Sequence, residues 1–177
     1  MMIHLILGGA RSGKSSYSEK QSLDVATQHE KQLHYIATAI SFDTEMESRI
    51  ELHQQQRDKR WQLHECPTKV PNLLSCFAHQ DVILVDCLTL WLNNVLFELG
   101  DDARSQDIER RVDELVNAIA GCKGDIFLVS NEVGLGVIPM GNLTRKFVDH
   151  AGWMNQKIAR VANNVTFVAA GLPLKMK

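Results

Sequence analysis

The sequence predicts an α/β fold in which a mostly parallel sheet is covered by helices on both faces. Apolar strand-like runs alternate with helical patterns along the chain. Several of these runs are apolar throughout, as strands buried on both faces tend to be. At 177 residues, with 45% apolar and 23% charged residues, the chain has an ordinary globular composition. We therefore expect a single domain over residues 1–177.

The expected strands and helices follow one another from the first residues onward. Strands are expected at 3–7, 33–37, 82–85, 126–130 and 165–169, with a weaker one at 61–64. Helices are expected from Gly13 to about Thr27 and over 44–57, where Thr44 and Glu47 have the spacing of a capping box. Two further helices each present an apolar stripe, Ile108, Val112, Leu115 and Ile119 in one, Leu143, Phe147, Ala151, Met154, Ile158 and Ala162 in the other. Ligands of such sheets bind beyond the carboxyl ends of the strands.

Charge and composition exclude several classes of function. The 19 basic and 21 acidic residues give a formal charge of −2, without the basic excess typical of nucleic-acid binding. No apolar run reaches the ~18–20 residues that span a bilayer, and no secretory signal opens the chain. The four cysteines form no CxxC pair. We expect a cytoplasmic protein with no nucleic-acid partner and no membrane insertion.

The first expected strand leads directly into a phosphate-binding motif. The string GGARSGKS has the pattern GxxxxGKS, preceded by a strand and followed by a helix, as a P-loop requires. Its glycines allow backbone N–H groups to converge on an anion. Lys14 is expected to reach the β and γ phosphates, and Ser15 to bind Mg²⁺. The sequence therefore predicts a P-loop NTPase-type sheet.

A carboxylate at the end of a later strand supports the same site. The run Val-Ile-Leu-Val ends in Asp86, which is expected to hold Mg²⁺ directly or through water. A turn-capping role is the alternative. The guanine-reading NKxD pattern of regulatory GTPases is missing from the sequence, which disfavours a switch-type GTPase.

A histidine lies in a cationic stripe of the expected helix over 44–57. Arg49, His53 and Arg57 are spaced by four residues and so share one helix face. Flanking guanidinium groups disfavour protonation of the imidazole, and a neutral imidazole is a nucleophile. The spacing suits attack by His53 on a nucleotide α-phosphate. From this pattern alone, an exposed polar face with an incidental histidine is the simpler interpretation.

Taken together, the motifs resemble the bifunctional adenosylcobinamide kinase / adenosylcobinamide-phosphate guanylyltransferase family. The resemblance spans nearly the whole chain, in order. Its strings are GGARSGKS, YIAT, RIELH, DCLTLW, SNEVGLG, GWMNQ and GLPLK.

The resemblance implies two reactions of cobalamin biosynthesis. In the first, adenosylcobinamide is phosphorylated with ATP or GTP. In the second, GMP from GTP is joined to adenosylcobinamide phosphate, with release of pyrophosphate. A covalent guanylyl-histidine intermediate is implied, on the histidine that closes the RIxxH string, which is His53 here. A homotrimer that uses Mg²⁺ is also implied.

The family's nucleotide contacts map onto this sequence by position. They are Gly8, Gly9, Ala10, Arg11, Ser12, Gly13, Lys14, Ser15, Ala37, Thr38, Ala39, Gln54, Gln55, Gln56, Arg57, Glu65 and Asp86. Lys14 and His53 are the expected catalytic residues, and Ser15 and Asp86 the expected metal ligands.

Three other functions remain open at this point. Some relatives retain only the guanylyltransferase activity. A P-loop kinase of another pathway would transfer the γ-phosphate without a covalent GMP. A nucleotide-binding regulatory module would bind GTP without transferring any group.

Overall fold

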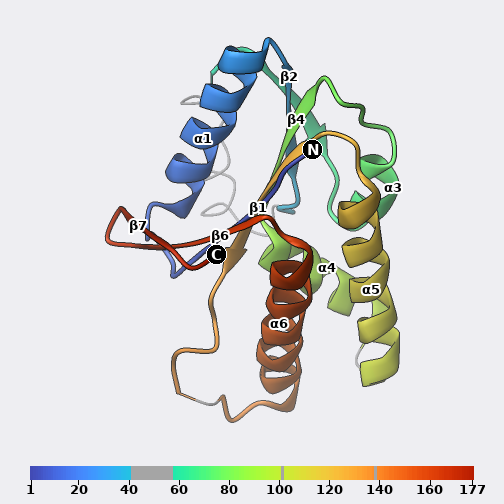
Figure 1. The fold of residues 1–177 in the computed structure, drawn as a ribbon. Helices are drawn as coiled ribbons and strands as arrows, with labels where there is room; N and C mark the ends of the chain where they lie inside the picture. Colours follow the sequence, from blue (N-terminus) through green and yellow to red (C-terminus); the bar gives the residue numbers. More distant parts are fainter. Residues whose placement is uncertain (41–57, 101, 138) are drawn as a thin grey trace.

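The computed structural model describes residues 1–40, 58–100, 102–137 and 139–177, which form a seven-stranded sheet between two layers of helices (Figure 1). The strand order is β3-β2-β4-β5-β1-β6-β7. Strand β7 pairs antiparallel with β6, and every other pair of neighbours is parallel. The strands are β1 (Ile3–Gly8), β2 (Gln32–Ala37), β3 (Trp61–Glu65), β4 (Asp81–Asp86), β5 (Asp125–Asn131), β6 (Asn164–Ala169) and β7 (Leu172–Lys175).

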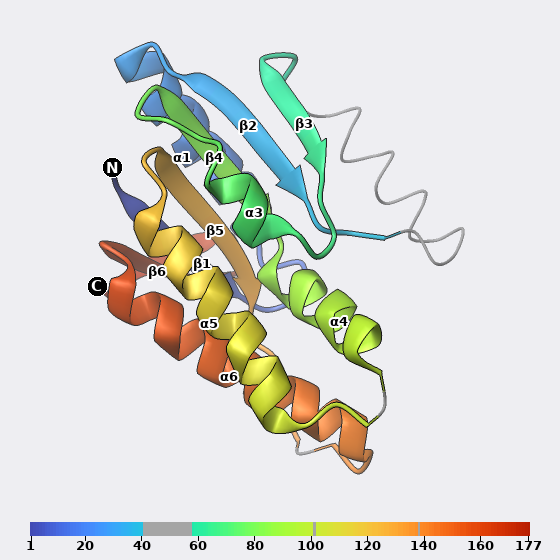
Figure 2. The ribbon, with the colours of Figure 1, turned by 90° about the vertical axis from the view of Figure 1, so that its right-hand side faces the viewer.

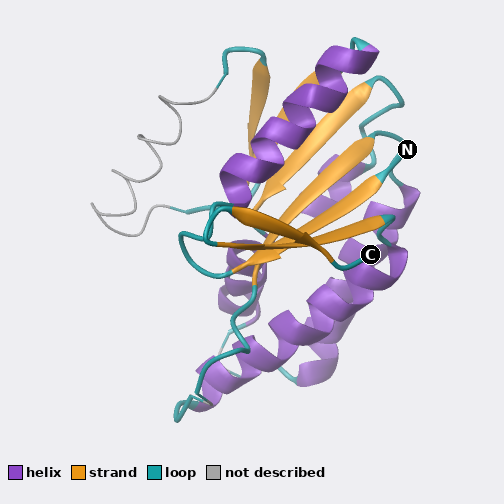
Figure 3. Cartoon of the chain, turned by 60° about the vertical axis from the view of Figure 1, so that its left-hand side comes forward, coloured by secondary structure: helices purple, strands orange, loops and turns teal. Residues whose placement is uncertain are grey.

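Helices cover both faces of the sheet, as the sequence predicts. Helix α1 (Lys14–His29) packs on one face, seen in front of the strands in Figure 3. The opposite face, turned toward the viewer in Figure 2, carries α3, α4, α5 and α6. Their bounds are Val70–Leu74, Leu88–Leu99, Ser105–Gly121 and Asn142–Val161.

Alternating side chains of the central strands build two hydrophobic layers. In β4, Ile83 and Val85 join the larger core together with Leu115 of α5 and Met154 of α6. Val82 and Leu84 of the same strand join the smaller core on the side of α1. Burial on both faces explains why the strand sequences are apolar throughout rather than alternating.

The expected strands are all present, each within one or two residues of its predicted ends. The helices after Gly13, over the Ile108 stripe and over the Ala151 stripe are also confirmed. At the start of α6 the stripe is not part of the core, because Leu143 is 52% exposed. The expected helix over 44–57 lies outside the described residues.

Three elements were not predicted from the sequence. Helix α4 shows no polar stripe because most of it is buried, with Leu88, Trp91 and Leu92 fully enclosed. Helix α3 is only five residues long. Strand β7 follows a tight turn at Ala170 and Gly171, whose φ angles of 51° and 77° allow the chain to reverse in two residues.

The parallel strands bring their carboxyl ends to one edge of the sheet. Along this edge Gly8 of β1 is in register with Asn131 of β5, while Asp86 of β4 is in register with Ala37 of β2. Glu65 of β3 is in register with Ala37 on its other side. Residues widely separated in the sequence therefore form one edge, at which a ligand can meet all of them.

Candidate active site

The P-loop lies between β1 and α1, at the centre of this edge. A Cβ atom on Gly8 would come within 2.5 Å of both Ser12 Oγ and Val168 O, so a side chain does not fit there. Gly13 has a φ of 92°, in the left-handed region that glycine adopts readily. The loop is therefore tightly folded over the end of β1.

The turn between β6 and β7 supports the P-loop from outside. The Gly171 N–H donates a hydrogen bond of 2.8 Å to Ser12 O. A Cβ on Gly13 would lie only 3.1 Å from Gly171 Cα. Sequence reasoning placed Gly171 in a family string without a role; the structure shows it in direct contact with the phosphate-binding loop.

Lys14 is buried, and its ammonium group lies against the loop itself. Its side chain is on the first residue of α1, and Nζ donates a 3.0 Å hydrogen bond to Gly9 O. The helix has neither a side-chain cap nor an acidic residue in its first turn. Its first N–H groups therefore remain available to an anion, and Lys14 can exchange its bond to Gly9 for a phosphate oxygen.

Asp86, at the end of β4, is half-buried and held by a neighbouring strand. Tyr35 of β2 donates its hydroxyl to Asp86 Oδ2 at 3.0 Å. This bond fixes the orientation of the carboxylate. Sequence reasoning placed Tyr35 in the family string YIAT without a role, because the contact depends on β2 and β4 being neighbours in the sheet.

The residues present suit a magnesium ion bound together with a nucleotide. A Ser15 hydroxyl and an Asp86 carboxylate are the hard oxygen ligands that Mg²⁺ prefers, with substrate phosphates and water completing the shell. Over the described ranges, no three His, Cys, Asp or Glu side chains gather closely enough to hold a metal by themselves. The neighbouring Cys87 thiol has a pKa raised by burial and by Asp86, so it stays protonated and is not a nucleophile.

The predicted nucleotide segment Ala37, Thr38 and Ala39 leaves the sheet beside Asp86. The Thr38 hydroxyl donates to Cys87 O at 2.7 Å and accepts from Cys87 N at 2.8 Å. The Thr38 N–H also donates to Asp86 O at 3.2 Å. Thr38 thus ties the end of β2 to the residues that follow β4.

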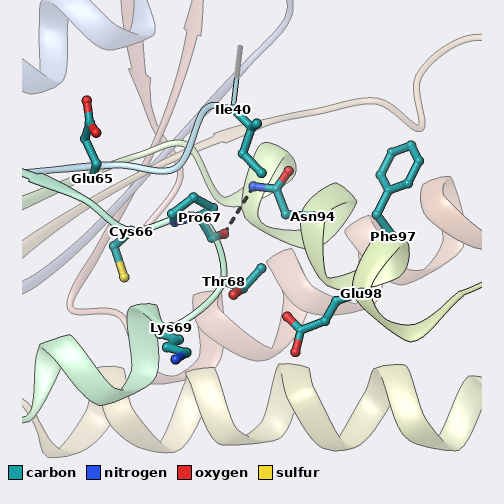
Figure 4. A pocket seen from close by; sticks show the side chains of 9 residues that line it. All are labelled: Ile40, Glu65, Cys66, Pro67, Thr68, Lys69, Asn94, Phe97 and Glu98. Atoms are coloured by element: carbon teal, nitrogen blue, oxygen red, sulfur yellow. Dashed lines mark hydrogen bonds between the residues drawn. The ribbon is translucent and has the colours of Figure 1, made fainter. Parts of the chain in front are cut away.

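Glu65 is exposed and lies at the margin of a pocket of about 570 Å³ beyond the ends of β2 and β3. Asn94 of α4 donates to Thr38 O at 2.7 Å and to Pro67 O at 3.2 Å, and so joins the walls of the pocket. Figure 4 shows the bond from Asn94 to Pro67. The lining residues are Ile40, Glu65, Cys66, Pro67, Thr68, Lys69, Asn94, Phe97 and Glu98.

The structure brings most of the predicted site residues to one edge. Gly8 to Ser15, Ala37 to Ala39, Glu65 and Asp86 all lie at or beyond the carboxyl ends of neighbouring strands. His53, Gln54, Gln55, Gln56 and Arg57 lie outside the described residues. Arg60 lies in the turn before β3, where it pairs with Asp58 at 3.0 Å and donates to Thr27 Oγ1.

Comparison with known proteins identifies the family to which this chain belongs. A family model described as CobU, cobinamide kinase / cobinamide phosphate guanyltransferase, matches residues 4–176. The chain belongs to the CobU family. It is thus a cobinamide kinase and cobinamide phosphate guanylyltransferase of cobalamin biosynthesis. This membership replaces the alternatives of a kinase from another pathway and of a regulatory module.

Two relatives match the chain over its whole length. The "Bifunctional adenosylcobalamin biosynthesis protein CobP" of Pseudomonas aeruginosa is 45% identical, over 99% of this chain and 98% of that protein. The "Bifunctional adenosylcobalamin biosynthesis protein CobU" of Salmonella typhimurium is 38% identical, over 99% of this chain and all of that protein.

A solved structure confirms the fold class. An ATPase domain superposes with a TM-score of 0.57 at 11% identity, covering 94% of this chain and 68% of the other. At that identity the likeness extends to the fold alone. Within the part of the chain that the structure describes, no helix has both the length and the apolar character to cross a membrane.

Proposed function

We propose that this CobU-family protein phosphorylates adenosylcobinamide with ATP or GTP and then transfers GMP from GTP to adenosylcobinamide phosphate through a guanylyl intermediate on His53. The observation that carries the proposal is the arrangement of one triphosphate site. The P-loop with Lys14 and Ser15 and the carboxylate of Asp86 lie at the same edge of one parallel sheet. Both reactions begin with a nucleoside triphosphate, so both can use this edge.

Lys14 and the N-terminus of α1 bind the phosphates of the nucleotide. Ser15 and Asp86 would hold Mg²⁺, which would neutralise phosphate charge and polarise the phosphorus under attack. In the kinase reaction, the substrate hydroxyl attacks the γ-phosphorus and the nucleoside diphosphate leaves.

In the second reaction, an imidazole nitrogen of His53 attacks the α-phosphorus of GTP and pyrophosphate leaves. A phosphate oxygen of the substrate then attacks the same phosphorus, and the imidazole leaves. The covalent step divides one difficult displacement into two easier ones.

The described residues that precede the His53 segment support its access to this site. The segment begins where β2 has ended, after Ile40, which lines the pocket beside Glu65. The described chain from Ala37 to Ile40 thus leaves β2 at the edge at which the P-loop opens. Ala37 to Ala39 and Glu65, which the family resemblance assigns to nucleotide contacts, border the same exit.

Transfer of label from the nucleotide to the protein tests the intermediate. Incubation with GTP labelled at the α-phosphate is expected to give one label per chain that is stable to base and released by acid, as a phosphoramidate is. His53→Ala is expected to abolish labelling. The matched control is His79→Ala, since His79 is exposed and lies just before the amino end of β4, away from the carboxyl-end edge. Undiminished labelling of His53→Ala would refute the proposed nucleophile.

A homotrimer in the cytoplasm, with residues 1–177 as one catalytic domain, also belongs to this proposal. It rests on the family resemblance. Light scattering coupled to gel filtration measures the molar mass, for which three times 19.9 kDa is expected. A monomer at micromolar concentration would contradict it.

A further inference from the structure

A buried polar network lies at the carboxyl end of β5, after the apolar residues 126–129 of the strand. Ser130 donates its hydroxyl to Asn155 Oδ1 at 2.7 Å, and Asn155 Nδ2 donates to Asn131 O at 3.4 Å. Asn131 in turn reaches Thr89 in the first turn of α4. Its Nδ2 and backbone N–H groups both donate to Thr89 Oγ1, at 3.1 Å and 3.4 Å.

One atom of this network has no hydrogen-bond partner within the described structure. Asn131 Oδ1 is buried and unpaired. With the amide nitrogen bonded to Thr89 Oγ1, the amide oxygen points away from that hydroxyl. A buried acceptor left unpaired costs about 1–3 kcal/mol, and folded proteins rarely retain one without a reason. The arrangement calls for a hydrogen-bond donor that the described chain does not supply.

The place of Asn131 restricts what that donor can be. Asn131 is in register with Gly8, the first residue of the P-loop, and the next residue, Glu132, donates its N–H to Gly8 O at 3.1 Å. On the other side of β5 lies β4, which ends in Asp86. The amide therefore lies between the phosphate-binding loop and the proposed metal ligand.

A nucleotide phosphate does not meet this requirement. Its oxygens are acceptors near neutral pH, and two acceptors facing each other repel. Two donors that come close to the phosphates in these reactions are the hydroxyl of the substrate that receives the γ-phosphoryl group and a water molecule bound to Mg²⁺.

We propose that Asn131 Oδ1 accepts a hydrogen bond from the alcohol that is phosphorylated in the kinase reaction, which makes Asn131 the acceptor-binding residue of that reaction. The proposal rests on the proposed function for its kinase reaction. The bond directs a lone pair of the hydroxyl oxygen toward the γ-phosphorus. The new oxygen–phosphorus bond forms as the bond between the γ-phosphorus and the bridging oxygen breaks. The hydroxyl proton passes to an oxygen of the transferred phosphoryl group, because an amide oxygen is too weak a base to keep it.

Access to the oxygen fits a rearrangement that nucleotide binding already requires. Lys14 Nζ is bonded to Gly9 O and has to leave it to reach a phosphate. Asn131 as a residue is only half-buried, although its oxygen is covered. The proposal requires that a shift of the P-loop on nucleotide binding uncovers this oxygen for the alcohol.

The two reactions of this family provide an internal control, since only the kinase reaction has an alcohol acceptor. Asn131→Ala is expected to lower kcat/KM for cobinamide phosphorylation roughly 10- to 100-fold, the loss typical of one well-placed hydrogen bond. Transfer of GMP to separately prepared cobinamide phosphate is expected to change less than about twofold. Equal losses in both reactions would assign the oxygen to metal-bound water or to general structure and overturn the proposal. No loss in either would overturn it too.

Two further variants keep the test decisive. Asn164→Ala is the matched control, because Asn164 begins β6 at the opposite edge of the sheet and is expected to leave both rates unchanged. If Asn131→Ala does not fold, Asn131→Ser keeps a hydroxyl near Thr89 but places no carbonyl oxygen. The same selective loss is expected of it. A negative result in the His53 labelling test leaves this one intact, because phosphorylation needs no covalent guanylyl group.

Discussion

Strands β4 and β5 present different chemistry at their two ends. At their amino ends, Asp81 and Asp125 are each 6% exposed and fully engaged by the protein. Asp81 accepts from Ala78 N at 2.7 Å and lies 3.3 Å from His34 Nε2. At the carboxyl ends, Asp86 is half-buried and Asn131 has an unpaired oxygen.

The difference follows from the direction of the strands. At the amino ends, the aspartates accept hydrogen bonds from backbone N–H groups of residues that precede β4 and β1. At the carboxyl ends, the P-loop and the connections beyond the strands surround a space for ligands. The two carboxylates of β4 are therefore expected to differ in role: Asp81 contributes to stability and Asp86 to turnover.

Replacing each carboxylate of β4 by its amide gives the largest expected effect. Asp86→Asn is expected to lower kcat of the kinase reaction at least about 100-fold, because a metal ligand contributes several kcal/mol to the transition state. Its stability is expected to change little. Asp81→Asn is expected to lower the free energy of unfolding by about 1–3 kcal/mol while kcat is retained.

Steady-state kinetics and urea unfolding of both variants check this contrast. A loss of turnover in Asp81→Asn, with the protein fully folded, would break it. So would a stability loss in Asp86→Asn as large as that in Asp81→Asn.

The sequence predicted the local parts of the molecule and not the contacts between distant parts. The P-loop and the apolar run before Asp86 are contiguous, so spacing alone identified them. The bond between Tyr35 and Asp86 depends on the sheet order, in which β2 lies beside β4. The contact of Gly171 with the P-loop likewise requires β6 to lie beside β1.

The contacts of the polar residues at the carboxyl end of β5 could not be predicted from the sequence either. Asn131 and Thr89 meet only because the first turn of α4 lies beside β5. Nothing in the residues themselves tells a satisfied amide from one with an unpaired oxygen. The role of His53 stays a prediction, since it comes from helical spacing and family resemblance.

Removing the Tyr35 hydroxyl tests how Asp86 is held at the carboxyl end of β4. Tyr35→Phe deletes the bond to Asp86 Oδ2 and keeps the ring, which packs edge-on against Trp61 with centroids 5.7 Å apart. Removal of a group that orients a metal ligand typically lowers metal affinity 10- to 100-fold. We expect about tenfold weaker binding of Mn²⁺ to the complex with GTP, measured by electron paramagnetic resonance. The magnesium requirement of the kinase is expected to rise in parallel.

Tyr17→Phe serves as the matched control, since Tyr17 is half-buried on α1 and packs against the smaller core. Its Mn²⁺ affinity is expected to equal that of the parent protein. Unchanged Mn²⁺ binding in Tyr35→Phe would mean that Asp86 needs no support from β2, or that it does not bind the metal.

The smallest expected effect is at the amino end of β5. Asp125 accepts from Met2 N at 2.7 Å and from Lys31 Nζ at 2.6 Å, and so anchors the N-terminal residues. Burial raises its pKa, but the bonds from Lys31 and Met2 outweigh this, and the pKa lies below its ordinary value of 3.8. Asp125→Asn removes the charge and keeps an acceptor, so a loss of about 1 kcal/mol is expected near pH 7.

The pH dependence of this loss distinguishes an ionic role from a packing role. A carboxyl group whose pKa is lower in the folded state stabilises the fold at pH values above the unfolded pKa, and this contribution is lost as the pH falls through the folded pKa. The difference in unfolding free energy between the parent protein and Asp125→Asn is therefore expected to shrink below about pH 4. Asp24→Asn, at an exposed position of α1, is the control. A difference that stays constant down to pH 2.5, or a loss of kinase turnover in folded Asp125→Asn, would contradict the assignment of this strand end to stability alone.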